Sequence, residues 1–124
     1  MPSLLKNSFR YNIKGLADDM EVSLGTLASL YSEFFHEMKI NIQESKELCI
    51  SKDWRKLERV IHNIKGISSC LYISDIYDSS QKLDTELKKQ NYETTSFDIN
   101  YMNTLLATCE IDIKEFFKKD GINI

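Results

Sequence analysis

The fold is set by residues 54–71, which read WRKLERVIHNIKGISSCL. Within this stretch, apolar or small residues recur at spacings of three and four, the repeat of one face of an α-helix. They are Leu57, Ile61, Ile64, Ser68 and Leu71, with Val60 and Ile67 beside them. The stretch therefore predicts an amphipathic helix that buries this stripe and exposes its other face.

His62 lies on the exposed face of this predicted helix. Successive helix residues turn by about 100°, so His62 points about 200° away from Val60 and from Ile64. Lys65 and Gly66 follow at i+3 and i+4 and share the face of His62. Glycine inside a helix costs about 1 kcal/mol relative to alanine, which indicates a specific reason for Gly66. We interpret it as clearance for a bulky anionic group beside His62; close helix packing is the alternative.

The rest of the chain consists of further amphipathic segments joined by short polar turns. Helices are predicted over residues 15–22, 23–50, 75–90 and 95–120. The expected N-caps are Ser23, Asp53, Ser74 and Thr95, the last with Asp98 three residues on. Four long helices with short turns predict an all-α protein, an antiparallel up-down-up-down four-helix bundle with a short N-terminal helix. We place a lead or linker at residues 1–14 and the bundle domain at residues 15–120.

Composition and spacing exclude several classes of function. The net charge of −3 lacks the basic balance of a nucleic-acid-binding protein. No apolar run approaches the roughly 18 residues of a membrane helix, so we expect no membrane insertion. Cys49, Cys70 and Cys109 fall on apolar helix faces without metal-ligand spacing, which predicts reduced core thiols in a cytoplasmic protein. Because the chain has no Walker or glycine-rich nucleotide loop, we expect no cofactor and no catalysis by the chain alone.

With these residues the sequence resembles the histidine-containing phosphotransfer (HPt) domain family of two-component phosphorelays. The resemblance covers residues 16–117 and is sharpest at His62-x-x-Lys65-Gly66, which precedes a helix centred on Leu83. It implies a bundle that accepts a phosphoryl group on His62 from a receiver-domain aspartate and passes it to another receiver. Lys65 would stabilise the phosphoryl charge and Gly66 would give steric clearance. The implied partners are response-regulator receiver domains and a hybrid sensor histidine kinase, which bring the metal and the activated phosphoryl group.

The chain departs from the family pattern at three positions. Ile67 stands where the family has a small residue, and Tyr72 where it has a glycine at the end of the helix. Asp84 stands where the family often has a neutral polar group, so a negative charge is expected near the phosphoryl site. These departures keep open a different function, a helical adaptor that binds receiver or kinase domains without being phosphorylated. A third alternative is a chemotaxis-kinase-type phosphoacceptor domain that a kinase loads from ATP.

On straight antiparallel helices, residues equally far from the connecting turn lie side by side. This rule identifies the expected neighbours of His62. Asp84 and Lys88 fall near its level on the following helix, and Ile40 falls near it on the preceding helix, off the apolar stripe. Together with Ser69, these residues are candidates for surrounding the phosphoryl group or for docking a partner. An exposed isoleucine beside a reactive histidine suits a docking surface, although a scattered surface isoleucine is an equal alternative.

The second histidine shows that a lysine three residues after a histidine is by itself a weak signal for a phosphoryl site. His36 also has a lysine at i+3, Lys39, but Ile40 occupies the position that matches Gly66. We interpret His36 as a boundary histidine without a functional role. The prediction for His62 therefore depends on the glycine and on its place in the bundle as well as on the lysine.

Overall fold

The computed structural model describes residues 11–124 and folds them into five α-helices. They are α1 (Ile13–Met20), α2 (Leu24–Ser51), α3 (Trp54–Cys70), α4 (Ser74–Lys88) and α5 (Thr95–Lys119). Residues 11–124 contain no strand, so the all-α prediction is confirmed.

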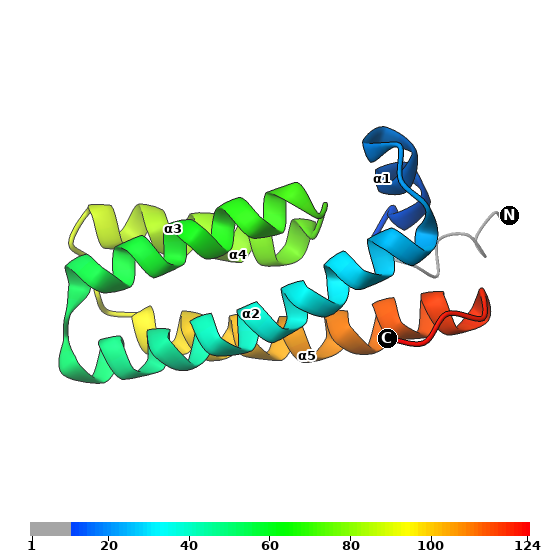
Figure 1. Ribbon diagram of the computed structural model, residues 1–124. Coiled ribbons are helices and arrows are strands. Elements are labelled where there is room, and N and C mark those ends of the chain that lie inside the picture. The colour runs from blue at the N-terminus through cyan, green and yellow to red at the C-terminus, as the bar shows by residue number, and fades with distance from the viewer. Residues whose placement is uncertain (1–10) are drawn as a thin grey trace, which may run out of the picture.

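The four long helices form an antiparallel bundle (Figure 1). α2 and α5 run side by side along the molecule, and the shorter α3 and α4 cover them. Each of these helices contacts its neighbours in the sequence and α2 also contacts α5, whereas among the described helices α3 does not contact α5. The short α1 lies beyond the ends of α3 and α4 and packs on α2. The predicted bundle with a short N-terminal helix is confirmed.

The predicted apolar stripes fill the interior of the bundle. On α3, Leu57, Ile61 and Ile64 are fully buried. They meet large side chains of the other long helices, among them Tyr31, Met38, Ile76, Leu83, Met102 and Phe117. Exposing one such side chain costs about 1.5–3 kcal/mol. The stripe therefore determines how α3 is rotated about its own axis, and with it the direction of every polar residue on that helix.

Two of the four predicted N-caps are confirmed. The Ser23 hydroxyl accepts a hydrogen bond from the backbone N–H of Thr26 at 3.1 Å, and the Asp53 carboxylate accepts one from Lys56 N–H at 3.4 Å. The other two predictions are wrong, because neither α4 nor α5 begins with a side-chain cap hydrogen bond. Ile73 precedes α4, so Ser74 is already its first helical residue.

At the start of α5, the predicted cap Thr95 is buried as the first helical residue, and Thr94 precedes it. The Thr94 hydroxyl donates to Asp98 at 2.9 Å. The capping box expected of Thr95 and Asp98 is therefore not formed, and Asp98 pairs with the hydroxyl of Thr94 instead.

The packed part of the chain begins earlier than predicted. α1 starts at Ile13, two residues before Gly15, and the side chains of Tyr11 and Ile13 are buried in the core. The packed part therefore begins before residue 15, where we placed the domain boundary. The sequence did not indicate this, because it offers no long apolar run there. Most of the predicted lead, residues 1–10, lies outside the described residues.

The three cysteines are free thiols in different environments. Cys109 is buried in the core, as expected, and Cys49 is partly buried. Cys70 is exposed, so its prediction as a core residue is wrong. It is the last residue of α3 and lies about 80° from His62 around the helix, which places it on the exposed side.

Tyr72 ends α3 in a way that usually favours glycine. Its φ is 58°, in the left-handed region, which costs a residue with a side chain about 1 kcal/mol. Two hydrogen bonds hold this end of the helix. The Tyr72 hydroxyl donates to Asp19 of α1 at 2.6 Å, and the Tyr31 hydroxyl donates to the Leu71 carbonyl at 2.9 Å. The departure from the family pattern at Tyr72 is therefore accommodated by side-chain contacts from α1 and α2.

Candidate functional site

His62 stands in the middle of α3 and faces solvent. Its neighbours in the sequence alternate between the buried stripe and the outer face, as the 3.6-residue repeat requires. Its side chain is 68% exposed, which agrees with the predicted direction. The imidazole is therefore accessible to a partner protein without any movement of the bundle.

Gly66 lies one helical turn after His62, and open space surrounds it. It is exposed, and a Cβ built on its backbone would meet no atom within 4 Å outside its own helix. Close helix packing therefore does not explain the glycine. The space that Gly66 leaves is on the same face as the His62 ring, where a group attached to the ring needs clearance.

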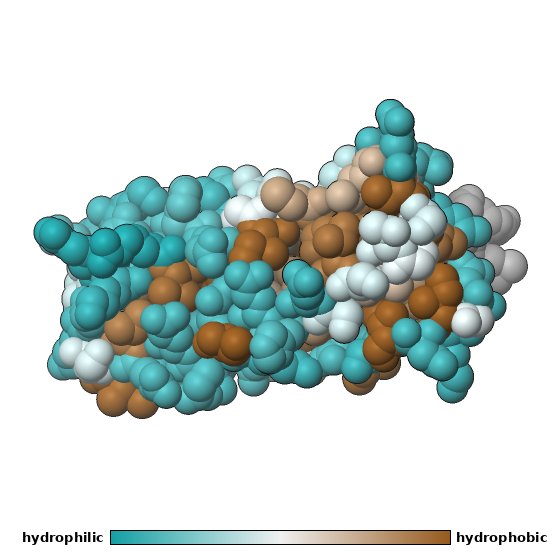
Figure 2. Space-filling view, in the orientation of Figure 1, coloured by the Kyte–Doolittle hydropathy of each residue, from teal (hydrophilic) through white to brown (hydrophobic). Residues whose placement is uncertain are grey.

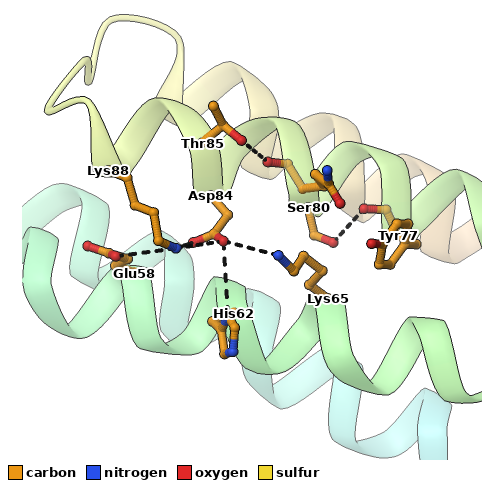
Figure 3. Close-up of polar contacts among 9 residues, drawn as sticks. Glu58, His62, Lys65, Tyr77, Ser80, Asp84, Thr85 and Lys88 are labelled. Atoms are coloured by element: carbon orange, nitrogen blue, oxygen red, sulfur yellow. Dashed lines mark hydrogen bonds and ion pairs between the residues drawn. The ribbon is translucent and has the colours of Figure 1, made fainter.

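Asp84 of α4 is the centre of a polar cluster between α3 and α4 (Figure 3). Its two oxygens each lie 2.8 Å from the Nζ of Lys88, and Oδ2 lies 3.4 Å from the Nζ of Lys65. The same Oδ2 lies 3.9 Å from Nδ1 of His62. Glu58, one turn before His62 on α3, reaches Lys88 at 3.5 Å. One carboxylate thus contacts three cationic or basic side chains from two helices.

The Asp84 carboxyl is ionised at neutral pH. Its side chain is only 5% exposed, and burial by itself raises the pKa of the carboxyl. The hydrogen bonds and positive charges of Lys88 and Lys65 outweigh this effect, and the pKa of Asp84 lies below its usual value. The hydrogen bond to Asp84 in turn raises the pKa of Lys88. The cluster is therefore a fixed negative charge held by two ammonium groups.

The two ring nitrogens of His62 face different surroundings. Nδ1 lies 3.9 Å from the carboxylate, and Nε2 points away from the cluster (Figure 3). A carboxylate near Nδ1 favours a proton on that nitrogen, because the pair is then attractive. In the neutral tautomer with its proton on Nδ1, the lone pair is on Nε2, the nitrogen that points away from the cluster.

The structure brings together some of the predicted site residues and leaves others apart. Asp84 and Lys88 lie beside His62 as the helix levels predicted, and Lys65 is on the same side. Ile40 is exposed on α2 as predicted, in a shallow hollow that belongs to α2 itself. Ser69 is exposed on α3, two turns after His62. Both lie outside the polar cluster around Asp84.

Two features of the site were not predicted. Lys65 was expected to present its charge to a phosphoryl group, but its ammonium is held by Asp84 and its side chain is only 25% exposed. Glu58 was not considered, although its position four residues before His62 places it on the same face.

The surroundings of the other histidine differ from those of His62. His36 is exposed on α2, where a boundary position was expected. Its i+3 lysine, Lys39, turns towards α5 and lies 3.1 Å from Glu110. His36 therefore has no counterpart of Asp84 among the described contacts, and it serves as an internal control for His62.

Comparison of the chain with protein-family models, with curated proteins and with solved structures found no match. Within residues 11–124, no helix is long and apolar enough to cross a membrane. In the same part of the chain, no group of three or more His, Cys, Asp or Glu side chains is arranged to hold a metal ion. The site is thus defined by its own geometry: an exposed imidazole on a four-helix bundle, next to a glycine clearing and a lysine-held carboxylate.

Proposed function

We propose that this protein is a phosphorelay intermediate that carries a phosphoryl group on Nε2 of His62. The single observation that supports this most strongly is the environment of the ring. Asp84 faces Nδ1, Nε2 points away from the polar cluster, and Gly66, one helical turn after His62, leaves open space on the same helix face. A carboxylate near one ring nitrogen, an accessible second nitrogen and a glycine one turn away are together what a phosphoryl carrier needs.

The proposed transfer needs little covalent chemistry from the protein. The Nε2 lone pair attacks the phosphorus of an aspartyl phosphate on a receiver domain, an N–P bond forms, and the O–P bond to the aspartate breaks. The aspartate leaves as a carboxylate with the bonding electrons. The proton stays on Nδ1, so the phosphorylated ring carries a positive charge, and Asp84 faces that charge. Transfer to a second receiver is the same step in reverse.

The lysines balance the charge of this step. A phosphoryl group on Nε2 brings negative charge to the ring that Asp84 faces from its Nδ1 side, and the two negative charges repel each other. Lys65 and Lys88 already neutralise that carboxylate, and Lys65 lies at i+3 from His62, within reach of a group on the ring. We assign Lys65 to the phosphoryl oxygens and Lys88 to the retention of Asp84. The receiver domain contributes the activated phosphoryl group and its metal.

A second candidate function is a helical adaptor that binds receiver or kinase domains through the same face without being phosphorylated. The observation that favours it is the engagement of Lys65 by Asp84, which occupies the charge that a phosphoryl group would use. The two functions differ in one measurable property. An adaptor binds a receiver whether or not His62 is present as a nucleophile, whereas a phosphorelay intermediate becomes covalently labelled.

The experiment that tests the proposal is incubation of the full chain with a panel of phosphorylated receiver domains. Transferred label on histidine is lost in acid and survives base. His36→Gln is the matched control for His62→Gln, because both histidines are exposed and both have a lysine at i+3. We expect label on the unmodified chain and on His36→Gln. Binding to a receiver without any label supports the adaptor instead, and an ATP-dependent kinase as the sole donor supports the kinase-loaded alternative.

A further inference from the structure

The outer face of α5 carries an uncharged stripe with the spacing of a helix-packing surface. The stripe consists of Phe97, Tyr101, Thr104, Thr108 and Ile111, all of them exposed. Phe97 is 70% exposed, Tyr101 50% and Ile111 66%. The residues follow one another at alternating spacings of four and three, which is the heptad pattern of a helix that packs along a second helix. None of them contributes to the core of the bundle.

The polar groups in the middle of the stripe are already satisfied. The Thr104 hydroxyl donates to the Asn100 carbonyl, and the Thr108 hydroxyl donates to the Thr104 carbonyl, both at 3.2 Å. Another protein surface can therefore cover these threonines without leaving an unsatisfied donor. Their small size also lets a second helix approach closely.

The outer faces of α2 and α3 carry charged residues. Lys39, Glu44 and Glu47 lie on the outer face of α2, and Arg55 and Arg59 on that of α3. The surface over α3 is accordingly mainly hydrophilic (Figure 2). In contrast, residues 99–109 of α5 include no charged residue. The stripe is therefore a particular property of α5 and not of the bundle surface in general.

We propose that this stripe is the surface through which two copies of the chain associate, with their α5 helices antiparallel about a two-fold axis. Such a contact uses the same patch on both copies, so the patch must complement itself. With the axis midway between Thr104 and Thr108, each Thr104 faces Thr108 of the second copy. Each Tyr101 then faces Ile111 of the second copy, and the large side chains flank a centre of small ones.

Charge supports the antiparallel direction. Glu115 is exposed and continues the heptad one step beyond Ile111, which brings it to Phe97 of the second copy. Phe97 borders a hollow of about 310 Å³ that Ser79 and Lys82 of α4 also line, together with Asp98, whose carboxylate accepts from the Thr94 hydroxyl. In this arrangement the Glu115 carboxylate meets the Lys82 ammonium. A parallel arrangement in register would place the two Glu115 carboxylates against each other instead.

The size of the surface indicates a weak dimer. From Phe97 to Glu115 the helix rises about 27 Å. One helix face of this length offers less than the roughly 800 Å² per partner of a standard stable interface. We therefore expect a dissociation constant in the micromolar range. Because α3 does not contact α5, the dimer leaves both His62 side chains uncovered, and this inference does not depend on the proposed function.

Sedimentation velocity of the full chain under reducing conditions tests the proposal. From about 5 to about 500 μM, the average mass should rise from 14.5 kDa towards twice that value. Ile111→Lys should weaken association at least about tenfold, because it buries an unpaired charge. Ile40→Lys is the matched control, since Ile40 is an exposed isoleucine on α2, and it should leave the association unchanged. Circular dichroism verifies that both variants keep their helices.

Charge exchange tests the direction of the helices. Lys82→Glu and Glu115→Lys should each weaken association, and the two together should restore it. A mass that stays at 14.5 kDa throughout the range overturns the proposal, as does equal weakening by Ile111→Lys and Ile40→Lys. Failure of the double exchange to restore association overturns the antiparallel pairing. If Ile111→Lys abolishes binding of a receiver domain while the chain is monomeric, the stripe serves that partner and not a second copy.

Discussion

Gly66→Gln separates steric clearance for a phosphoryl group from a role in packing. A Cβ at Gly66 would meet no atom within 4 Å beyond its own helix, so a larger side chain creates no clash inside the bundle. Glutamine is a better helix former than glycine by about 0.5–1 kcal/mol. The free energy of unfolding should therefore rise by that amount. For a domain of this size the midpoint of thermal unfolding should rise by about 2–5 °C.

The same substitution should obstruct the proposed chemistry. The glutamine side chain extends over the face of α3 that His62 occupies, one turn away. We expect phosphoryl transfer from a receiver to slow by about tenfold or more, a barrier increase of about 1.4 kcal/mol. Gly66→Ala is the matched control, because its methyl group gives the helix-forming gain without reaching the ring. It should unfold at a higher temperature and transfer at the original rate.

Thermal melts and transfer rates measured on the same samples decide between the two explanations. Clearance predicts a Gly66→Gln protein that is at least as stable as the original and slow in transfer. A Gly66→Gln protein that is less stable but transfers normally would show that Gly66 serves the fold. In that case the open space beside His62 has no part in the function.

Three further substitutions test individual contacts. Asp84→Asn should lower the free energy of unfolding by about 1–2 kcal/mol, less than for a fully buried pair, because Lys65 and Lys88 are partly exposed and can turn to water. Because the folded state lowers the pKa of Asp84 below its ordinary value of 3.8, this stabilisation is present above that pH and is lost as the pH falls through the folded-state pKa. Chemical unfolding from pH 7 to pH 2 should therefore show the difference between the two proteins shrinking in acid; a constant difference contradicts the ionised carboxylate. Lys65→Ala should slow transfer from a given phosphorylated receiver and change the thermal midpoint little, and an unchanged rate would leave Lys65 as a partner of Asp84 alone. Gln90→Gly should raise the free energy of unfolding by about 0.5–1 kcal/mol, because Gln90 has a left-handed φ of 59°. Thermal unfolding of Gln90→Gly and of the control Gln90→Ala checks this. Equal midpoints for the two variants would argue against backbone strain at Gln90.

The sequence predicted those parts of the site that depend on a single helix. The stripe of Leu57, Ile61 and Ile64 determines the rotation of α3, so the exposure of His62 and Gly66 follows from periodicity alone. The level of Asp84 was predictable as well, because a short turn joins two antiparallel helices of similar length.

The contacts between helices could not be predicted in the same way. The direction of the Lys65 side chain depends on the burial of Asp84, and that burial results from the packing of α4 against α3. Helix periodicity gives no information on which of several nearby anions a flexible lysine selects. The orientation of the His62 ring, with Nδ1 towards Asp84, depends on the same tertiary contact.

Local signals near helix ends were accurate only to about one residue. Ser74 and Thr95 have the residue type of an N-cap, but each lies one position inside its helix. Tyr72 has a left-handed conformation and donates its hydroxyl to Asp19 of α1, a contact that joins residues far apart in the sequence. The burial of Tyr11, which donates to Asp75 of α4, is likewise a long-range effect.

The most direct test of the central claim is phosphoryl transfer to His62→Gln. The side chain of His62 is 68% exposed, so its replacement should change the free energy of unfolding by no more than about 0.5 kcal/mol. The unmodified chain and His36→Gln should both acquire an acid-labile, base-stable label from a phosphorylated receiver, and His62→Gln should acquire none. A folded His62→Gln protein that is still labelled, or label that depends on His36, would contradict the assignment of His62 as the phosphoryl carrier.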